Sequence, residues 1–298
     1  MTEASVYILL LNWNGWKDTL ECVESCRNLS YPNFRLLLVD NGSSDSSESI
    51  LRERFPETEF IQTGANLGFA GGNNVGIRHA LTKGADYVWL LNNDTVVEPD
   101  ALSALVQVAK ADKKVGMVGS KIVYHGDPNL LWYAGAVLDE EKPYHPFHIG
   151  LDVKDHGQYA DVCETGYITG CSLLARREMV EAVGLLSDEL FLYFEDVDWS
   201  ARAKAAGWKL MYCPESLVYH KVSISTGGAA SPTLLYYTSR NRLYFVKRNF
   251  PGKLIHALLY DLYEHVLVNL KKRRFSAAWF AVKGICDFLR GKTGRLEA

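Results

Sequence analysis

Blocks of apolar positions alternate with polar stretches along the first third of the chain. Apolar runs at residues 6–11, 34–39 and 87–91, and a shorter one at 59–62, are short for helices and rich in branched and aromatic side chains. Such runs are typical of buried strands. The intervening stretches at 19–29 and through Ile50 and Leu51 favour helices. This alternation predicts an α/β fold with a mostly parallel sheet and right-handed crossovers.

Three of the predicted strands end in polar turns, at residues 12–15, 40–45 and 92–94. Parallel strands bring their carboxyl ends to one edge of the sheet, where open α/β sheets bind ligands. We therefore expect the three turns to lie together. Two simpler interpretations exist: turns favour Asn, Asp, Gly and Ser in any case, and Asp94 is a candidate cap for the helix that Pro99 opens.

A segment rich in Gly and Asn, residues 66–76, precedes the strand at 87–91. We interpret it as a loop whose four glycines let the backbone approach a ligand closely. The dinucleotide fingerprint GxGxxG and the phosphate loop GxxxxGK[ST] do not occur in the sequence. A nucleotide would therefore bind here through interactions other than those of these two motifs.

Composition narrows the class of protein. The 298 residues, 48% of them hydrophobic, suffice for one large domain or a domain with an appendage. The six cysteines form no CxxC pair, which argues against a zinc ribbon or a thioredoxin. They suit reduced thiols in a cytosolic protein. The sequence lacks a signal pattern and an apolar run of about 20 residues. We expect a cytoplasmic protein, with peripheral binding to the inner face of the cell membrane as an option.

The charge is unevenly distributed. From Arg240 onward the chain has 13 Lys/Arg and 4 Asp/Glu, about +9, so the remainder carries −12. A basic tail on an acidic body suggests an anionic surface as partner. Apolar residues at helical spacing and the basic run 271–274 fit docking on a membrane, with packing on the core or a homodimer interface as equal alternatives. The spaced residues are Leu254, Leu258, Leu259, Leu262, Val266 and Leu270.

Six stretches, in order over roughly residues 5–245, carry a family resemblance: 11–14, 39–45, 66–76, 91–94, 193–199 and 218–220. The chain resembles inverting family 2 glycosyltransferases of the GT-A fold, particularly the rhamnosyltransferase-like branch. The resemblance implies a catalytic domain over 1–225, with a nucleotide-sugar half at about 1–98 and an acceptor half at about 99–225. Residues 226–298 would form a loop and a basic helical extension, and the connection at 223–232 could cover the donor.

For the donor, the resemblance implies a pyrimidine-binding Asp40 beside the turn that shapes its pocket, and a Gly/Asn segment near the nucleotide. The turn contains Asn12, Trp13 and Asn14, and the segment contributes Asn66, Gly68, Gly71 and Asn73. Arg240 or Arg242 is a candidate contact for the diphosphate, with a surface salt bridge as the alternative.

Asn92, Asn93 and Asp94 occupy the place of the family's DXD motif. Asn at the first position leaves Asp94 as the charged metal ligand of the motif. His220 matches a second metal contact, with a half-buried strand histidine as the alternative. The cofactor implied is Mg²⁺ or Mn²⁺, and an imidazole suits Mn²⁺ better.

On the acceptor side, Asp196 matches the general base, since a carboxylate within hydrogen-bond reach can take the acceptor's proton. The resemblance places Gly170 and Cys171 along the acceptor, and Glu195 is a further candidate contact. We interpret Asp198 as structural. Residues 121–169, rich in aromatic and His side chains, are expected to form an irregular acceptor region.

The function expected is inverting transfer of a sugar, most simply from dTDP-L-rhamnose, to a hydroxyl of a glycan or lipid-linked saccharide in cell-surface polysaccharide synthesis. A UDP-hexose, galactofuranose or N-acetylhexosamine donor is the alternative within this class. A sugar-nucleotide-binding protein without catalysis and a nucleotidyltransferase are alternatives outside it. No nucleic-acid partner is expected.

Overall fold

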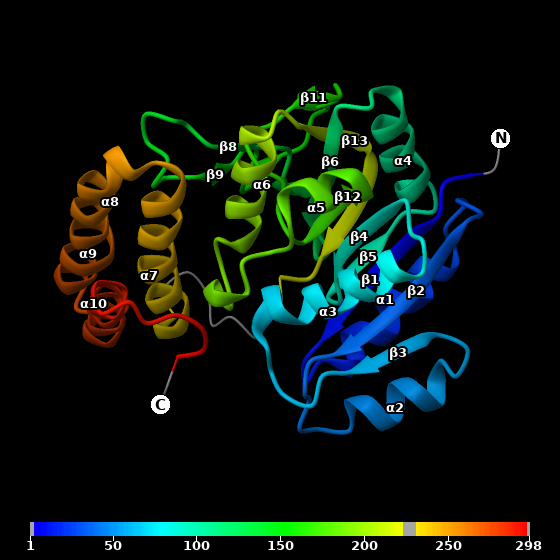
Figure 1. The fold of residues 1–298 in the computed structure, drawn as a ribbon, viewed down its shortest axis with the longest axis horizontal. Coiled ribbons are helices and arrows are strands. Elements are labelled where there is room, and N and C mark those ends of the chain that lie inside the picture. Colours follow the sequence, from blue (N-terminus) through cyan, green and yellow to red (C-terminus); the bar gives the residue numbers. More distant parts are fainter. Residues whose placement is uncertain (1–2, 223–230, 297–298) are drawn as a thin grey trace.

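The protein, seen here in a computed structural model that describes residues 3–222 and 231–296, is built on an 11-stranded mixed sheet (Figure 1). Its main path runs β10-β7-β6-β12-β4-β1-β2-β3. Those strands are β1 (Val6–Asn12), β2 (Phe34–Asp40), β3 (Glu59–Gln62), β4 (Tyr87–Asn92), β6 (Val115–Tyr124), β7 (Asp127–Tyr133), β10 (Val153–Lys154) and β12 (Ser172–Arg176).

Strands β1 to β4 are parallel, and the path turns antiparallel at β12, β6, β7 and β10. Beside this path, β13 (Lys209–His220) pairs parallel with β6 and antiparallel with β5 (Thr95–Val97) and β11 (Cys163–Glu164). A separate two-stranded sheet joins β8 (Ala136–Val137) to β9 (Phe147–His148). The predicted α/β fold, with a mostly parallel central sheet and a C-terminal helical extension, is confirmed, and β1 to β4 are the strands that are parallel to one another.

Helices cover both faces of the sheet because alternate strand residues point to opposite sides. Ile8 and Leu10 pack with α1 (Trp16–Arg27), α2 (Ser47–Arg54) and α4 (Ala101–Ala111). Tyr7 and Leu9 pack with α3 (Gly68–Thr82), α5 (Arg177–Val183) and α6 (Glu195–Ala205). The sheet edge is thereby held between two rigid layers.

The Gly/Asn segment differs from the predicted loop, because most of it is the first half of α3. A Cβ on Gly72 would lie 2.5 Å from Leu11 Cδ1, and one on Gly76 would lie 3.0 Å from Leu9 Cδ1. These two glycines therefore let the helix approach β1 closely. Gly68 has a positive φ of 76° at the start of the helix, a conformation that glycine adopts readily.

Helices of the C-terminal part stand together at one end of the molecule (Figure 1). They are α7 (Pro232–Asn249), α8 (Leu254–Tyr260), the π-helical turn η4 (Asp261–Leu267), α9 (Val268–Lys271) and α10 (Phe275–Leu289), with a 3₁₀ turn η3 (Pro251–Lys253) before α8. A further turn, η1 (Asp188–Leu190), precedes α6. The predicted domain boundary at 225/226 and most of the predicted donor-covering connection lie outside the described residues.

Candidate active site

The polar turns after β1, β2 and β4 lie at one edge of the sheet, as the sequence predicts. Asn12 is in register with Asp40, and Leu11 with Asn92. Thr19 on α1 joins two of the turns: its hydroxyl donates to Asn12 Oδ1 at 2.9 Å and accepts from Asn93 Nδ2 at 2.8 Å. These hydrogen bonds fix the edge before any ligand binds.

Asp40 is fully buried and anchors the turn after β2. Each of its carboxylate oxygens accepts two hydrogen bonds, at 2.7 to 2.9 Å. The donors are Asn12 Nδ2, the N–H and hydroxyl of Ser43, and Gln62 Nε2. A nucleobase would have to replace one of these donors to reach the carboxylate.

The neighbouring residues of the predicted donor pocket are placed differently. Asn14, with a positive φ of 52°, accepts from the Ser44 N–H at 2.8 Å, so it joins the two turns. The Trp13 side chain is 49% exposed. An exposed indole in the turn after β1 offers an aromatic surface for stacking.

The remaining predicted donor residues build the entrance to α3. The side chain of Asn66 accepts from the Gly68 N–H at 2.8 Å, and that of Asn73 donates to the Phe69 carbonyl at 2.9 Å. A Cβ on Gly71 would lie 2.9 Å from Leu67 Cβ. These interactions stabilise the local fold.

A pocket of about 640 Å³ opens beside this edge. All of the predicted metal, catalytic and acceptor residues and two of the predicted donor residues line it, although they come from four separate parts of the chain. They are Asn92, Asn93, Asp94, Gly170, Cys171, Glu195, Asp196 and His220. Leu11 and Phe69 line it as well, whereas Asn12, Asp40 and Asn66 do not.

Asp94 and His220 form a pair in the lining of the pocket. Nε2 of His220 lies 3.3 Å from Oδ1 of Asp94, and both side chains are largely buried. The Trp132 ring packs edge-on against the imidazole at 4.6 Å. Among the described residues, Nδ1 of His220 has no hydrogen-bond partner.

A carboxylate and an imidazole at this distance fit a divalent cation that takes its other ligands from a diphosphate and water. Within residues 3–222 and 231–296, no group of three or more His, Cys, Asp or Glu side chains forms a complete protein metal site. The pair itself offers one carboxylate and one imidazole to a cation.

Asp196 lies in the first turn of α6, facing the pocket. Its Oδ2 accepts from the Gly170 N–H at 2.9 Å, and Oδ1 accepts from the Val197 N–H at 2.8 Å. Burial raises the pKa of this carboxyl, and the backbone donors oppose that shift. A carboxylate with a raised pKa that is still stabilised as an anion can accept a proton near neutral pH.

The adjacent Glu195 is buried as well, and its own backbone N–H is the backbone donor that stabilises its anion. In the described part of the chain its Oε2 has no hydrogen-bond partner. Burial and then the nearby Asp196 carboxylate raise the pKa of Glu195 well above its usual range. The pKa of Glu195 is therefore raised further than the pKa of Asp196, whose anion the backbone donors stabilise.

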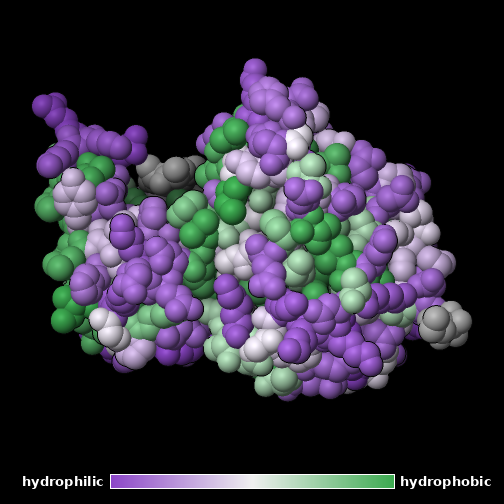
Figure 2. All heavy atoms as spheres, turned by 90° about the horizontal axis from the view of Figure 1, so that it is seen from above, coloured by the Kyte–Doolittle hydropathy of each residue, from purple (hydrophilic) through white to green (hydrophobic). Residues whose placement is uncertain are grey.

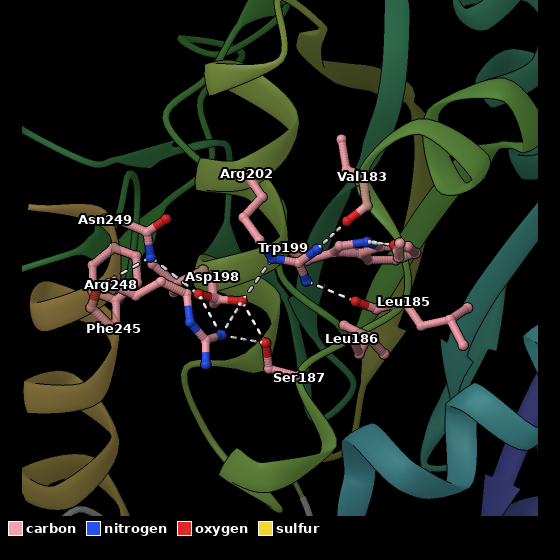
Figure 3. A network of polar contacts seen from close by, with 12 residues as sticks. Val183, Leu185, Leu186, Ser187, Asp198, Trp199, Arg202, Phe245, Arg248 and Asn249 are labelled. Atoms are coloured by element: carbon pink, nitrogen blue, oxygen red, sulfur yellow. Dashed lines mark hydrogen bonds and ion pairs between the residues drawn. The ribbon is translucent and has the colours of Figure 1, made fainter.

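Asp198 does not line the pocket and instead lies within a network of polar contacts, shown in Figure 3. Its carboxylate accepts from Ser187 at 2.7 Å, from Arg202 Nε at 2.9 Å and from Asn249 at 3.0 Å. Arg248 Nη1 lies 3.3 Å from it. This network joins α6 to α7 and to the turn before η1.

The two candidate arginines have different positions. Arg240 is fully buried outside the pocket, where it donates to the Leu190 and Gly294 carbonyls, so its position does not suit contact with a diphosphate. Arg242 lines the pocket, and its Nη1 hydrogen-bonds the buried Asp261 carboxylate of η4. Sequence alone does not separate the two, because both lie on α7 two residues apart.

Some pocket residues come from the predicted acceptor region. Trp132 and His148 line the pocket with their rings 4.6 Å apart. Burial lowers the pKa of His148 to about 4, so this imidazole is neutral at physiological pH. Thr238 also lines the pocket, and no sequence motif singled it out.

Comparison with solved structures agrees with this fold. A mannosyltransferase from Pyrobaculum calidifontis, solved with GDP-Man and Mn²⁺, superposes with a TM-score of 0.59 at 16% identity, covering 99% of this chain and 77% of that one. GalNAc-T7, solved with UDP, GalNAc and Mn²⁺, superposes with a TM-score of 0.65 at 16% identity, covering 96% and 57%. These neighbours define the class as the GT-A fold.

The model of the glycosyl transferase family 2 domain matches residues 6–184, more than half of the chain. N-acetylglucosaminyl-diphospho-decaprenol L-rhamnosyltransferase of Mycobacterium tuberculosis is 29% identical over 213 residues, covering 64% of this chain and 68% of the relative. The dTDP-rhamnosyl transferase RfbF of Shigella flexneri is 22% identical over 309 residues, covering 98% of each chain. The protein belongs to glycosyl transferase family 2, in its rhamnosyltransferase-like branch.

Proposed function

We propose that the protein is a metal-dependent, inverting glycosyltransferase that moves L-rhamnose from dTDP-L-rhamnose to a hydroxyl of a lipid-linked saccharide. The observation that carries this proposal is one pocket that holds Asp94, His220 and Asp196 together. The pocket thus combines Asp94 and His220, which suit a metal that neutralises the leaving diphosphate, with Asp196, which suits an attacking hydroxyl.

The leaving group calls for positive charge, because the bond to the sugar breaks as negative charge develops on the diphosphate. Asp94 and His220 would hold the Mg²⁺ or Mn²⁺ that supplies this charge. Asn92 and Asn93, on the same edge, would orient the donor. The nucleotide base would lie along the edge toward Asp40 and the exposed Trp13.

The acceptor hydroxyl loses its proton as its oxygen attacks the anomeric carbon. Asp196 accepts this proton, and the Gly170 N–H holds the carboxylate in position at 2.9 Å. The protonated Glu195 donates a hydrogen bond to the acceptor, since its Oε2 has no partner among the described residues. Attack on the face opposite the diphosphate inverts the anomeric carbon, through an oxocarbenium-like state.

Both sugar and acceptor are inferred from relatives. Two curated relatives carry rhamnosyltransferase names, and one of them names a diphospho-decaprenol acceptor. A lipid-linked acceptor would bring the protein to a membrane surface in cell-surface polysaccharide synthesis. The alternative donor for the same transfer reaction is a UDP-hexose, a UDP-hexosamine or a galactofuranose donor.

The test is turnover of a donor panel with Mn²⁺, combined with calorimetric binding of dTDP, UDP, GDP and ADP. We expect metal-dependent binding of dTDP over UDP, transfer from dTDP-L-rhamnose, and an inverted anomeric configuration in the product by NMR. Preference for UDP would reject rhamnose and keep the class of reaction. Nucleotide binding without turnover of any donor would indicate a non-catalytic sugar-nucleotide-binding protein.

A further inference from the structure

The C-terminal helices carry large apolar side chains on their outer side. We call six of them the apolar face: Ile255, Leu259, Leu262, Tyr263, Phe275 and Trp279. Their exposed fractions run from 39% to 72%. Figure 2 shows hydrophobic side chains gathered along the margin of the molecule where these helices lie. Monomeric proteins rarely expose large contiguous apolar patches without a partner.

The internal packing of these helices is already complete on their other side. Ala257 and Val266 are buried, as are Ala277 and Ala281 of α10. Gly284 lets α10 approach α7 closely, since a Cβ there would lie 2.4 Å from the Tyr236 carbonyl oxygen. The predicted packing on the core thus accounts for one side of the helices and leaves the apolar face uncovered.

A basic cluster borders the apolar face. Lys271, Lys272, Arg273 and Arg274 are all exposed, at the junction of α9 and α10. Nζ of Lys271 lies 6.0 Å from the centroid of the Tyr263 ring, which joins the cluster to the face.

The acidic residues of these helices oppose this charge weakly. Asp261 is buried against Arg242, and Asp287 is buried with a hydrogen bond from Tyr236. Glu264 is the remaining carboxylate between residues 254 and 289, against five Lys/Arg in the same stretch. The surface there is positive, whereas the chain before Arg240 carries −12.

We propose that the apolar face and the basic cluster dock the protein on an anionic phospholipid bilayer. Apolar side chains next to exposed Lys and Arg match the boundary between acyl chains and anionic headgroups. The acidic body is repelled by the same headgroups, so the charge distribution favours a single orientation. Among the described residues no helix is long and apolar enough to cross a membrane.

The docking helices also reach the pocket. Asp261 and His265 of η4 contact the guanidinium of Arg242, which lines the pocket, while Leu262 and Tyr263 of the same turn are exposed. The Arg242 guanidinium lies 5.4 Å from the ring centroid of Phe194, immediately before Glu195 and Asp196. Docking therefore places the pocket one helix away from the bilayer. This last step rests on the proposed function, in which the acceptor is lipid-linked.

The experiment is sedimentation of the full chain with phosphatidylcholine vesicles and with vesicles that also contain phosphatidylglycerol, without donor or metal. We expect partitioning into the anionic vesicles that weakens with salt. Reversing the cluster (K271E/K272E/R273E/R274E) or removing apolar anchors (I255S/L259S/W279S) should each lower it by more than about tenfold. Brominated lipids should quench the fluorescence of the wild type more than that of Trp279→Phe.

The matched controls lie on the catalytic body. Lys83→Glu with Lys113→Glu and Lys114→Glu removes exposed basic residues there, and Leu151→Ser removes an exposed apolar one. These variants should partition like the wild type, and circular dichroism should confirm that all variants fold.

Absent partitioning, or equal partitioning of the docking variants and the wild type, would overturn the proposal. So would a wild-type dimer, seen by light scattering, that the I255S/L259S/W279S variant converts to monomer, because a second copy would then cover the face. Vesicle binding requires no sugar donor. Its failure would therefore leave the proposed transferase activity to be judged separately by donor turnover.

Discussion

Oδ1 of Asp94 lies 3.3 Å from Nε2 of His220, although the two residues belong to distant parts of the chain. The antiparallel pairing of β5 with β13 causes this, because it aligns Thr95 with His220. A backbone hydrogen bond from the Lys221 N–H to the Asp94 carbonyl, at 2.9 Å, fixes the same junction. The two proposed metal ligands are thus held together by sheet register.

Replacing either member of this pair should remove metal-dependent nucleotide binding. We expect Asp94→Ala and His220→Ala to lower the Mn²⁺-dependent part of dTDP affinity by more than about 100-fold, since even outer-shell changes cost roughly 10- to 100-fold. Calorimetric titration with and without Mn²⁺ measures this part directly. His256→Ala, at an exposed position on α8, is the matched control and should bind as the wild type does. Unchanged affinity in Asp94→Ala would contradict the metal role.

Asp196 should be needed for transfer but not for donor binding. Asp196→Asn keeps the size of the side chain and removes the proton acceptor, so we expect the rate of transfer to fall about 10²- to 10⁴-fold. The affinity for dTDP should stay within about twofold, because in the proposed reaction Asp196 contacts the acceptor side. The measurement pairs single-turnover kinetics with calorimetry. A normal rate of transfer would show that another group accepts the proton.

The buried, protonated Glu195 should make stability fall as pH rises. Below the ordinary Glu pKa of 4.5 the carboxyl is protonated in both the folded and the unfolded state. Above it the unfolded state releases the proton while the folded state keeps it, so the free energy of unfolding decreases by up to about 1.4 kcal/mol per pH unit until the folded pKa is passed. Glu195→Gln does not titrate and should gain stability relative to the wild type over this range.

Urea denaturation of both proteins from about pH 5 to about pH 8 measures that difference. A difference that widens with pH supports a protonated Glu195. A constant difference would indicate that the carboxyl is ionised throughout.

The Asp198 network should matter for stability rather than for chemistry. Asp198→Ala removes the carboxylate that the partly exposed Arg202 and Arg248 share, and losing charge-assisted hydrogen bonds of this kind costs about 1.5–3 kcal/mol. Asp112→Ala, which breaks a surface pair with Lys209, should cost less than about 1 kcal/mol. Thermal and chemical denaturation compare the two. Equal effects of the two substitutions would refute the interpretation of Asp198 as a structural anchor.

The grouping of polar turns at the sheet edge was predictable from the sequence, because each strand and the turn after it are encoded by a short local pattern. Apolar runs locate the strands, and the parallel order then brings Asn12, Asp40 and Asn92 together. The motif order added Asp196 and His220, which the structure places with Asp94 in one pocket. No local pattern specifies that these residues meet, because the meeting depends on β12 pairing with β4 and on β13 pairing with β5 and β6.

The roles and conformations of other residues depend on tertiary packing, which the sequence alone does not reveal. Arg240 and Arg242 share a helix, yet Arg240 is fully buried away from the pocket whereas Arg242 lines it. The glycines of 66–76 appear in sequence as a loop, because Gly has low helix propensity. Close packing of α3 on β1 outweighs that propensity at Gly72 and Gly76.

The close approach of α3 to the sheet gives the last prediction, for Gly72→Ala. The added Cβ would meet Leu11 Cδ1 at 2.5 Å and the Asn41 side chain at 3.1 Å. Overpacking of this kind costs about 1–3 kcal/mol of unfolding free energy. Gly252→Ala is the matched control, since a Cβ there meets nothing within 4 Å, and it should change stability by less than about 0.5 kcal/mol.

The two variants should also differ in nucleotide binding. Asn41 hydrogen-bonds the Gly68 carbonyl at 3.0 Å and the Leu67 N–H at 3.0 Å, so displacing it disturbs the entrance to α3. We expect weaker dTDP binding in Gly72→Ala at a temperature where the variant is still folded, and wild-type binding in Gly252→Ala. Wild-type stability and affinity in Gly72→Ala would mean that the contact between helix and strand relaxes at little cost. The glycine would then have no packing role.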